Sequence, residues 1–270
     1  MKDNKNIIEA LLEIVESVME SVTECISTQD YAEVIKHRPT GITRRVDLVA
    51  EESLEAVLSE RGICARIVSE ELGERIVPTD GEPICTLVFD PVDGSTNAIS
   101  GIPFFCTSLA YSSKINDVKF DDIEAGVVRT FTGKTYHAIK GGGAYLDGKK
   151  IIPKKNPAKR PVISIYTYGV PEVPQGVIEL GKKVIARTLG SIAMEMCLVA
   201  EGVTDGLVDV RKLINGYDIM ASMLVLKEAG GILTDNKGRE INEDVGVSNL
   251  YIVGAMEPEM HEMILLELSR

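Results

Sequence analysis

The chain has 270 residues, 44% of them hydrophobic and 26% charged, as in an ordinary globular protein with room for one large domain or two lobes sharing a core. Its formal net charge of −12 and pI near 4.9 argue against nucleic acid and against an anionic membrane surface as partners. No stretch approaches the ~18 consecutive apolar residues of a membrane span, and the five cysteines are widely spaced and odd in number, which is typical of reduced core residues in a cytoplasmic protein.

Two long helices are predicted before the first strand. Apolar residues recur with the helical period over residues 5–27 and again over about 44–60, where Asp47 falls in the first turn. The stretch between them, 28–42, carries Pro39 and is expected to be a loose, mobile loop.

The next elements predict a sheet. A strand over 65–68 ends at Ser69-Glu70-Glu71, and a polar loop then leads to a short apolar run over 84–89, which is typical of a buried strand. Further strands are expected at 104–112, 124–131, 134–139 and 144–146, most of them paired antiparallel.

Three prolines at 153, 157 and 161 mark a boundary between two lobes. We expect a metal-binding α+β lobe with an antiparallel sheet over 1–155, and an α/β lobe over 156–270 that completes the substrate site. The second lobe alternates between predicted strands (162–168, 184–189, 206–210, 232–234, 250–255) and predicted helices (190–201, 215–230, 258–268).

The most informative stretch is Asp90-Pro91-Val92-Asp93-Gly94-Ser95-Thr96-Asn97, directly after the apolar strand. Two carboxylates ~4 Å apart repel by roughly 4 kcal/mol at an effective dielectric of ~20. Either one of them stays protonated or a cation lies between them, and oxygen ligands favour a hard ion such as Mg²⁺. We therefore predict a divalent-metal site on an enzyme that processes phosphate.

Three further acids end a strand or begin a helix: Asp47, Glu70 and Asp218. Each has an ordinary explanation alone, since acids favour the first turn of a helix and solvated turns. A merely structural turn, in contrast, does not need two acids, a glycine and two hydroxyls directly after a buried strand.

Ser69-Glu70-Glu71, the stretch from Asp90 to Asn97, and Gly216-Tyr217-Asp218 resemble the three signatures of the inositol monophosphatase family, and the helix that Gly190-Ser191 opens resembles the family's glycine-led helix. The resemblance covers nearly the whole chain in the right order. It implies a mixed α and β fold, the layered αβαβα sugar-phosphatase fold. The resemblance is nearest to the archaeal branch, whose members often act on both fructose 1,6-bisphosphate and inositol 1-phosphate. It also suggests a homodimer.

The resemblance implies the metal ligands. Two Mg²⁺ ions, with Mn²⁺ as a substitute, would be bound by Glu70, Asp90, Asp93, Asp218 and the Val92 carbonyl. Asp47 would help to hold a third, weaker ion, although the residues before it differ from the family pattern.

The resemblance also implies the catalytic and substrate contacts. Ser95, where most members have threonine, would orient the attacking water together with Asp47 or Glu70, and Gly94 and Ser95 would receive the phosphate beside Asp93. The substrate would further contact Ile192, Asp209, Arg187 and Arg211; without the resemblance, both arginines would be assigned to the surface.

Other phosphatase chemistries are not encoded. The sequence has no Cys-x₅-Arg loop, no Gly-x₄-Gly-Lys-(Ser/Thr) loop and no Ser-His-Asp set, so we expect direct attack of a metal-activated water without a phosphoenzyme. A haloacid-dehalogenase phosphatase needs acids one residue apart, whereas Asp90 and Asp93 are separated by two. The alternatives left open are a nucleotide 3′-phosphatase of the same superfamily and a non-catalytic metal-binding relative.

Overall fold

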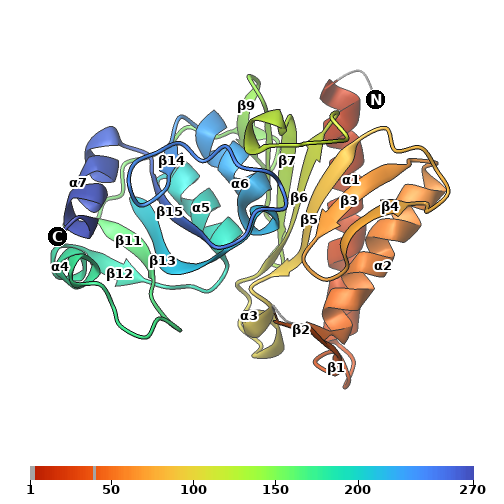
Figure 1. The fold of residues 1–270 in the computed structure, drawn as a ribbon, viewed down its shortest axis with the longest axis horizontal. Helices are drawn as coiled ribbons and strands as arrows, with labels where there is room; N and C mark the ends of the chain where they lie inside the picture. Colours follow the sequence, from red (N-terminus) through yellow and green to blue (C-terminus); the bar gives the residue numbers. More distant parts are fainter. Residues whose placement is uncertain (1–3, 39–40) are drawn as a thin grey trace.

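The structure, a computed structural model, describes residues 4–38 and 41–270 and has five layers (Figure 1). A pair of helices covers one face of an eight-stranded sheet, two helices lie between that sheet and a second, five-stranded sheet, and two more helices cover the far side. The expected αβαβα arrangement is confirmed. Pro39, which belongs to the predicted loose loop, lies outside the described residues.

The first layer is α1 (Asn4–Ile26) and α2 (Arg45–Glu60). Both helices present an apolar stripe that is fully buried against each other and against the sheet, as the sequence period predicts. Leu11 and Leu54 are 1% and 0% exposed, so truncating either to alanine removes roughly 2–5 kcal/mol of stability.

The eight-stranded sheet has the order β10-β9-β8-β7-β6-β5-β3-β4, and only the β3–β5 pair is parallel. Its strands are β3 (Ala65–Ser69), β4 (Gly73–Val77), β5 (Thr86–Asp93), β6 (Cys106–Ser112), β7 (Ala125–Thr130), β8 (Thr135–Ile139), β9 (Gly143–Leu146) and β10 (Lys149–Lys150). β5 is buried along its whole length, as the apolar run predicts, and its register with β6 shifts between Asp90 and Asp93. The irregularity lies between the two aspartates, and each of them keeps a register partner on β6.

The central layer joins the two halves of the chain. It consists of α5 (Ile192–Glu201) and α6 (Gly216–Glu228), and most residues of both helices are buried. One apolar cluster contains side chains from the first sheet, from both helices and from the second sheet, for example Val88, Met196 and Leu207. The halves therefore share their largest core.

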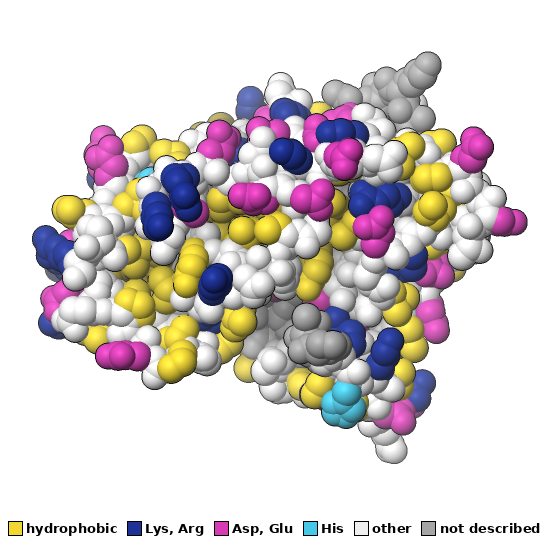
Figure 2. Space-filling view, viewed as in Figure 1, with side chains coloured by type: hydrophobic (Ala, Val, Ile, Leu, Met, Phe, Trp, Pro, Cys, Tyr) yellow, Lys and Arg dark blue, Asp and Glu magenta, His cyan; other side chains and the backbone are white. Residues whose placement is uncertain are grey.

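The second sheet has the order β12-β11-β13-β15-β14. Its strands are β11 (Val162–Tyr166), β12 (Ile185–Arg187), β13 (Gly206–Ile214), β14 (Ile232–Thr234) and β15 (Leu250–Ala255). α4 (Gln175–Lys183) and α7 (Pro258–Leu268) pack against each other on its outer face. On the face shown in Figure 2, acidic and basic side chains are interspersed over both halves.

Several elements differ from the sequence expectation. The predicted loop 28–42 contains most of a hairpin, β1 (Val34–Arg38) and β2 (Gly41–Arg44), and the predicted polar loop after Glu71 contains β4. The short helices α3 (Ser95–Ile99) and η1 (Phe120–Asp122), and α4, were also missed. Most of these elements are short, and the charged β1 and β4 lack the apolar alternation that reveals a strand.

Candidate active site

A cleft of about 660 Å³ opens where the end of β5 meets the N-termini of α5 and α6. Most of the residues predicted for the site line it: Glu70, Asp90, Val92, Asp93, Gly94, Ser95, Ile192, Arg211 and Asp218. The two sheets thus bring together residues that are up to 148 positions apart in the chain.

Three carboxylates form the floor of this cleft. Oxygens of Glu70, Asp90 and Asp218 all lie within 4.8 Å of one another. Glu70 directly follows β3, Asp90 lies on β5, and Asp218 is in the first turn of α6, where it accepts a hydrogen bond from the Asn215 backbone N–H (2.7 Å).

The electrostatics of the three acids show their mutual repulsion. Burial, followed by the charge of Glu71, raises the pKa of Glu70 to about 8. Burial and the Glu70 charge raise the pKa values of Asp90 and Asp218 well above the ordinary range. A divalent cation would replace the protons that such a cluster otherwise retains, and the all-oxygen donor set fits Mg²⁺.

Asp93 is held differently from the other acids. One carboxylate oxygen accepts hydrogen bonds from the Ser191 hydroxyl (2.6 Å) and the Ala193 N–H (2.7 Å), and the other accepts from the Ile192 N–H (3.2 Å). These donors belong to the beginning of α5, so Asp93 caps a helix from the other half of the chain. Burial raises its pKa to about 6, although these hydrogen bonds favour the ionised form.

Close backbone contact explains why glycine follows Asp93. Gly94 has a φ of +92°, and a Cβ there would lie 3.1 Å from the carbonyl oxygens of Gly190 and Phe104. Asn97 ties the same segments together, because its side-chain amide donates to the carbonyls of Phe104 and Leu189 (2.7 Å each). The wall of the cleft is therefore built by backbone packing between α3 and the loop before α5.

A buried glutamate supports that loop from behind. Glu195, on the first turn of α5, accepts hydrogen bonds from the N–H groups of Leu189 (3.1 Å) and Gly190 (3.2 Å), and from the Tyr166 hydroxyl. The sequence does not reveal this role, because a glutamate in the first turn of a helix ordinarily interacts only with that helix.

The opposite wall carries a cation. The Arg211 guanidinium lies over the rings of Tyr166 (4.5 Å) and Tyr168 (4.2 Å) and pairs with both oxygens of Asp209. Stacking and a bidentate pair restrict a side chain that would otherwise be flexible. The two tyrosines were not predicted, although their spacing of two residues places them on one face of an extended segment.

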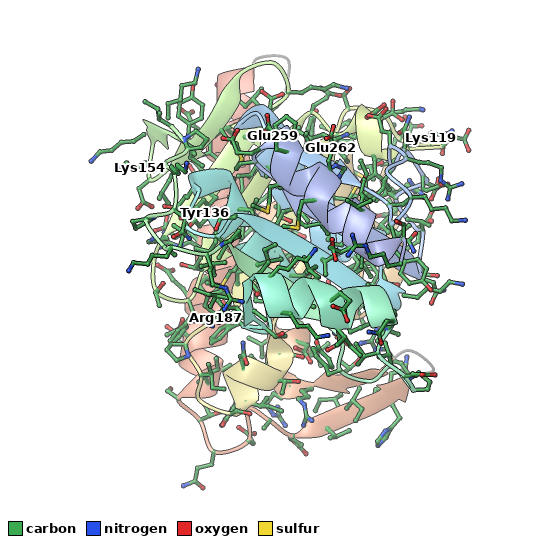
Figure 3. All side chains as sticks on the ribbon, turned by 90° about the vertical axis from the view of Figure 1, so that its left-hand side faces the viewer. Lys119, Tyr136, Lys154, Arg187, Glu259 and Glu262 are labelled. Carbon is green, nitrogen blue, oxygen red and sulfur yellow. The ribbon has the colours of Figure 1, made fainter. Side chains whose placement is uncertain are left out.

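Three predicted residues lie outside the cleft lining. Asp47 is buried behind Glu70 and accepts a hydrogen bond from the Arg44 N–H (2.8 Å), and burial raises its pKa to about 6. Asp209 is fully buried beneath Arg211. Arg187 is exposed at the end of β12, the edge strand of the second sheet (Figure 3).

Glu70 is flanked by a further residue that was not predicted. Arg38, the last residue of β1, approaches the carboxylates of Glu70 (3.5 Å) and Glu71 (2.8 Å) and donates to the Glu70 carbonyl. Sequence analysis placed this residue in a mobile loop.

Comparison with known proteins relates the whole chain to one group. Residues 3–270 match the model of the inositol monophosphatase family. The fructose-1,6-bisphosphatase of Pyrococcus furiosus is 34% identical, covering 95% of this chain and 96% of its own. The fructose-1,6-bisphosphatase/inositol-1-monophosphatase of Methanothermobacter thermautotrophicus is 35% identical, covering 94% and 93%.

Two further relatives bear on fold and substrate. A solved Pyrococcus horikoshii protein, described as similar to inositol-1 monophosphatase, superimposes with a TM-score of 0.82 at 30% identity, covering 99% of this chain and all of its own. The bifunctional NADP phosphatase/NAD kinase of Methanococcus maripaludis is 33% identical over 96% of this chain but only 49% of its own length. Among the described residues, no helix has the length and apolar character that crossing a membrane requires.

Proposed function

The chain belongs to the inositol monophosphatase family and is a metal-dependent phosphoric monoester hydrolase, and from that premise we propose that it releases phosphate from fructose 1,6-bisphosphate and from inositol 1-phosphate. One observation supports this proposal above all others. The Glu70–Asp90–Asp218 cluster and the stacked Arg211 line the same cleft, so a metal-binding site and an anion-binding site face one substrate-sized space.

The carboxylates of Glu70, Asp90, Asp93 and Asp218 and the Val92 carbonyl would hold Mg²⁺, for which Mn²⁺ can substitute. When bound, two such ions activate water, neutralise the phosphate and stabilise the leaving alkoxide. Asp93 contributes a second effect that needs no metal: it fixes the start of α5, and with it Ile192, against the end of β5.

Ser95 and Gly94 are assigned to the phosphate and to the attacking water. Both line the cleft next to Asp93, and the positive φ of Gly94 turns the chain there. We assign the Ser95 hydroxyl, with Glu70, to orienting the water, and Asp47 to supporting Glu70 from behind. We propose that this water displaces the leaving group directly, without a side-chain nucleophile.

Arg211 is assigned to the second phosphate of a bisphosphate. Its guanidinium is kept in place by Asp209 and the two tyrosines, so little rotamer entropy is lost when an anion binds. We assign Asp209 a positioning role, and Arg187, on the exposed edge strand, to the outer rim of the site. We further propose that the protein acts as a homodimer in the cytoplasm.

Phosphate release with Mg²⁺ from fructose 1,6-bisphosphate, inositol 1-phosphate, NADP and a nucleoside 3′-phosphate tests the proposal. We expect turnover of the first two, lost in Asp218→Asn and retained in Glu262→Gln, which removes an exposed acid on α7. Arg211→Met should raise KM about tenfold or more for the bisphosphate and much less for inositol 1-phosphate. Release from the nucleotides alone would replace this proposal by the nucleotide phosphatase.

A further inference from the structure

Arg38 is the residue through which β1 makes a buried contact with the metal-binding edge of the cleft. The four preceding residues of that strand, Val34–His37, are exposed, whereas the Arg38 side chain is 9% exposed. On the opposite strand of the hairpin, Ile42 is 41% exposed. Apolar packing by these residues therefore does not explain why the end of β1 lies against the body of the protein.

Polar contacts provide the explanation. Arg38 pairs with the Glu71 carboxylate (2.8 Å), lies 3.5 Å from that of Glu70, and donates to the Glu70 carbonyl. Glu71 is itself 7% exposed and the neighbouring Asp47 is 3% exposed. Three acids thus lie at this edge, and the Arg38 guanidinium pairs directly with two of them, Glu70 and Glu71.

The base of the hairpin is fixed independently of Arg38. The Arg45 and Val46 N–H groups donate to the carbonyls of Glu33 (2.9 Å) and Tyr31 (3.2 Å), and the Tyr31 hydroxyl donates to the Ile99 carbonyl (3.0 Å). Because the base has its own attachments, the ion pairs of Arg38 are not needed to keep the hairpin folded. We therefore look for the role of these ion pairs in the charges of the neighbouring acids.

We propose that Arg38 is a built-in cation of the metal site, which holds Glu70 and occupies the Glu70–Glu71–Asp47 edge that a third divalent ion would otherwise take. The inference rests on the proposed function, since it assumes that Glu70, Asp90 and Asp218 bind divalent metal. A guanidinium remains charged at all working pH values, and unlike a weak metal site it does not empty when the ion concentration falls.

Binding of Mn²⁺ alone, followed by the electron paramagnetic resonance signal of free Mn²⁺, tests the inference. The variants are Arg38→Ala, Arg38→Gln and Arg38→Lys. Arg45→Ala is the matched control, because Arg45 carries the same charge at the base of the same hairpin but pairs with the exposed acids Asp30 and Glu33. Arg38→Gln keeps a hydrogen-bond donor and serves if the alanine variant does not fold.

We expect Arg38→Ala and Arg38→Gln to bind one more Mn²⁺ per chain than the wild type, and Arg38→Lys and Arg45→Ala to match the wild type. Equal Mn²⁺ stoichiometry in all variants would overturn the inference alone. A wild type that binds no Mn²⁺ would overturn the metal site and the proposed function with it.

Discussion

Replacing Asp90 by asparagine should make the metal-free protein more stable while it abolishes activity. Asp90 is 2% exposed and lies within 4.8 Å of carboxylate oxygens of Glu70 and Asp218. At that separation and an effective dielectric of ~20, each like-charge pair costs about 3.5 kcal/mol. This is an upper bound, because Glu70 is 34% exposed and the cluster can bind a proton. The asparagine oxygen can still accept the Val92 N–H.

We therefore expect a gain of about 2 kcal/mol in EDTA, which for a chain of this length is about 4 °C in Tm. With Mg²⁺ at a hundredfold excess over its Kd, the wild type gains ~2.7 kcal/mol from the ion and the variant does not, so the order reverses. Thermal unfolding in EDTA and in Mg²⁺ measures both effects. Glu262→Gln is the control and should change by less than ~0.5 kcal/mol. An Asp90→Asn protein that melts below the wild type in EDTA would refute the repulsion argument.

Three other predictions concern the pH dependence of stability, the backbone conformation at Gly94 and the role of Glu195 behind the cleft wall. The pKa of Glu70 in the folded protein is raised to about 8, so in EDTA its contribution to stability is fully present below its ordinary pKa and is lost as the pH rises through 8. Urea unfolding should therefore give a higher free energy of unfolding at pH 6 than at pH 9. Equal values at the two pH values would contradict this. Gly94→Ala should lose roughly 1–3 kcal/mol more than Gly133→Ala in the same unfolding assay, because both glycines have positive φ but only Gly94 lacks space for a Cβ. Glu195→Gln should raise KM, because Glu195 supports the loop before α5. The control is Glu201→Gln, which also removes the carboxylate partner of a tyrosine but at the far end of α5, and which should lower stability without raising KM. Equal KM values for the two variants would show that the loop does not need Glu195.

The part of the site that is encoded locally could be predicted from the sequence. Asp90, Asp93 and Gly94 follow a buried strand within a few residues, and no distant contact is needed to see that two acids there require compensation. The approach of Asp218 to Asp90 depends instead on α6 lying between the two sheets, which no local pattern specifies. Resemblance to known signatures supplied that long-range information.

Residues whose roles depend on a neighbour in space were predicted less well. Arg38 ends a strand with no apolar alternation, so its burial against Glu71 could not be anticipated. Asp209 and Arg211 are two residues apart on β13 and share a face, so their pairing could have been predicted from strand periodicity. The prediction that Asp209 contacts the substrate is still a prediction.

The helical layer between the sheets has a consequence for how the protein unfolds. Since α5 and α6 fill the space between the two sheets, separating the halves would expose the apolar cluster that both of them share. Severing the chain in the 151–161 connection should yield two aggregation-prone fragments, and the intact protein should melt in a single cooperative transition. The bond network that Asp93 makes to α5 crosses the same seam, so opening the seam would also dismantle the cleft. The shared apolar cluster and the hydrogen bonds of Asp93 therefore oppose rigid-body closure of one half on the other.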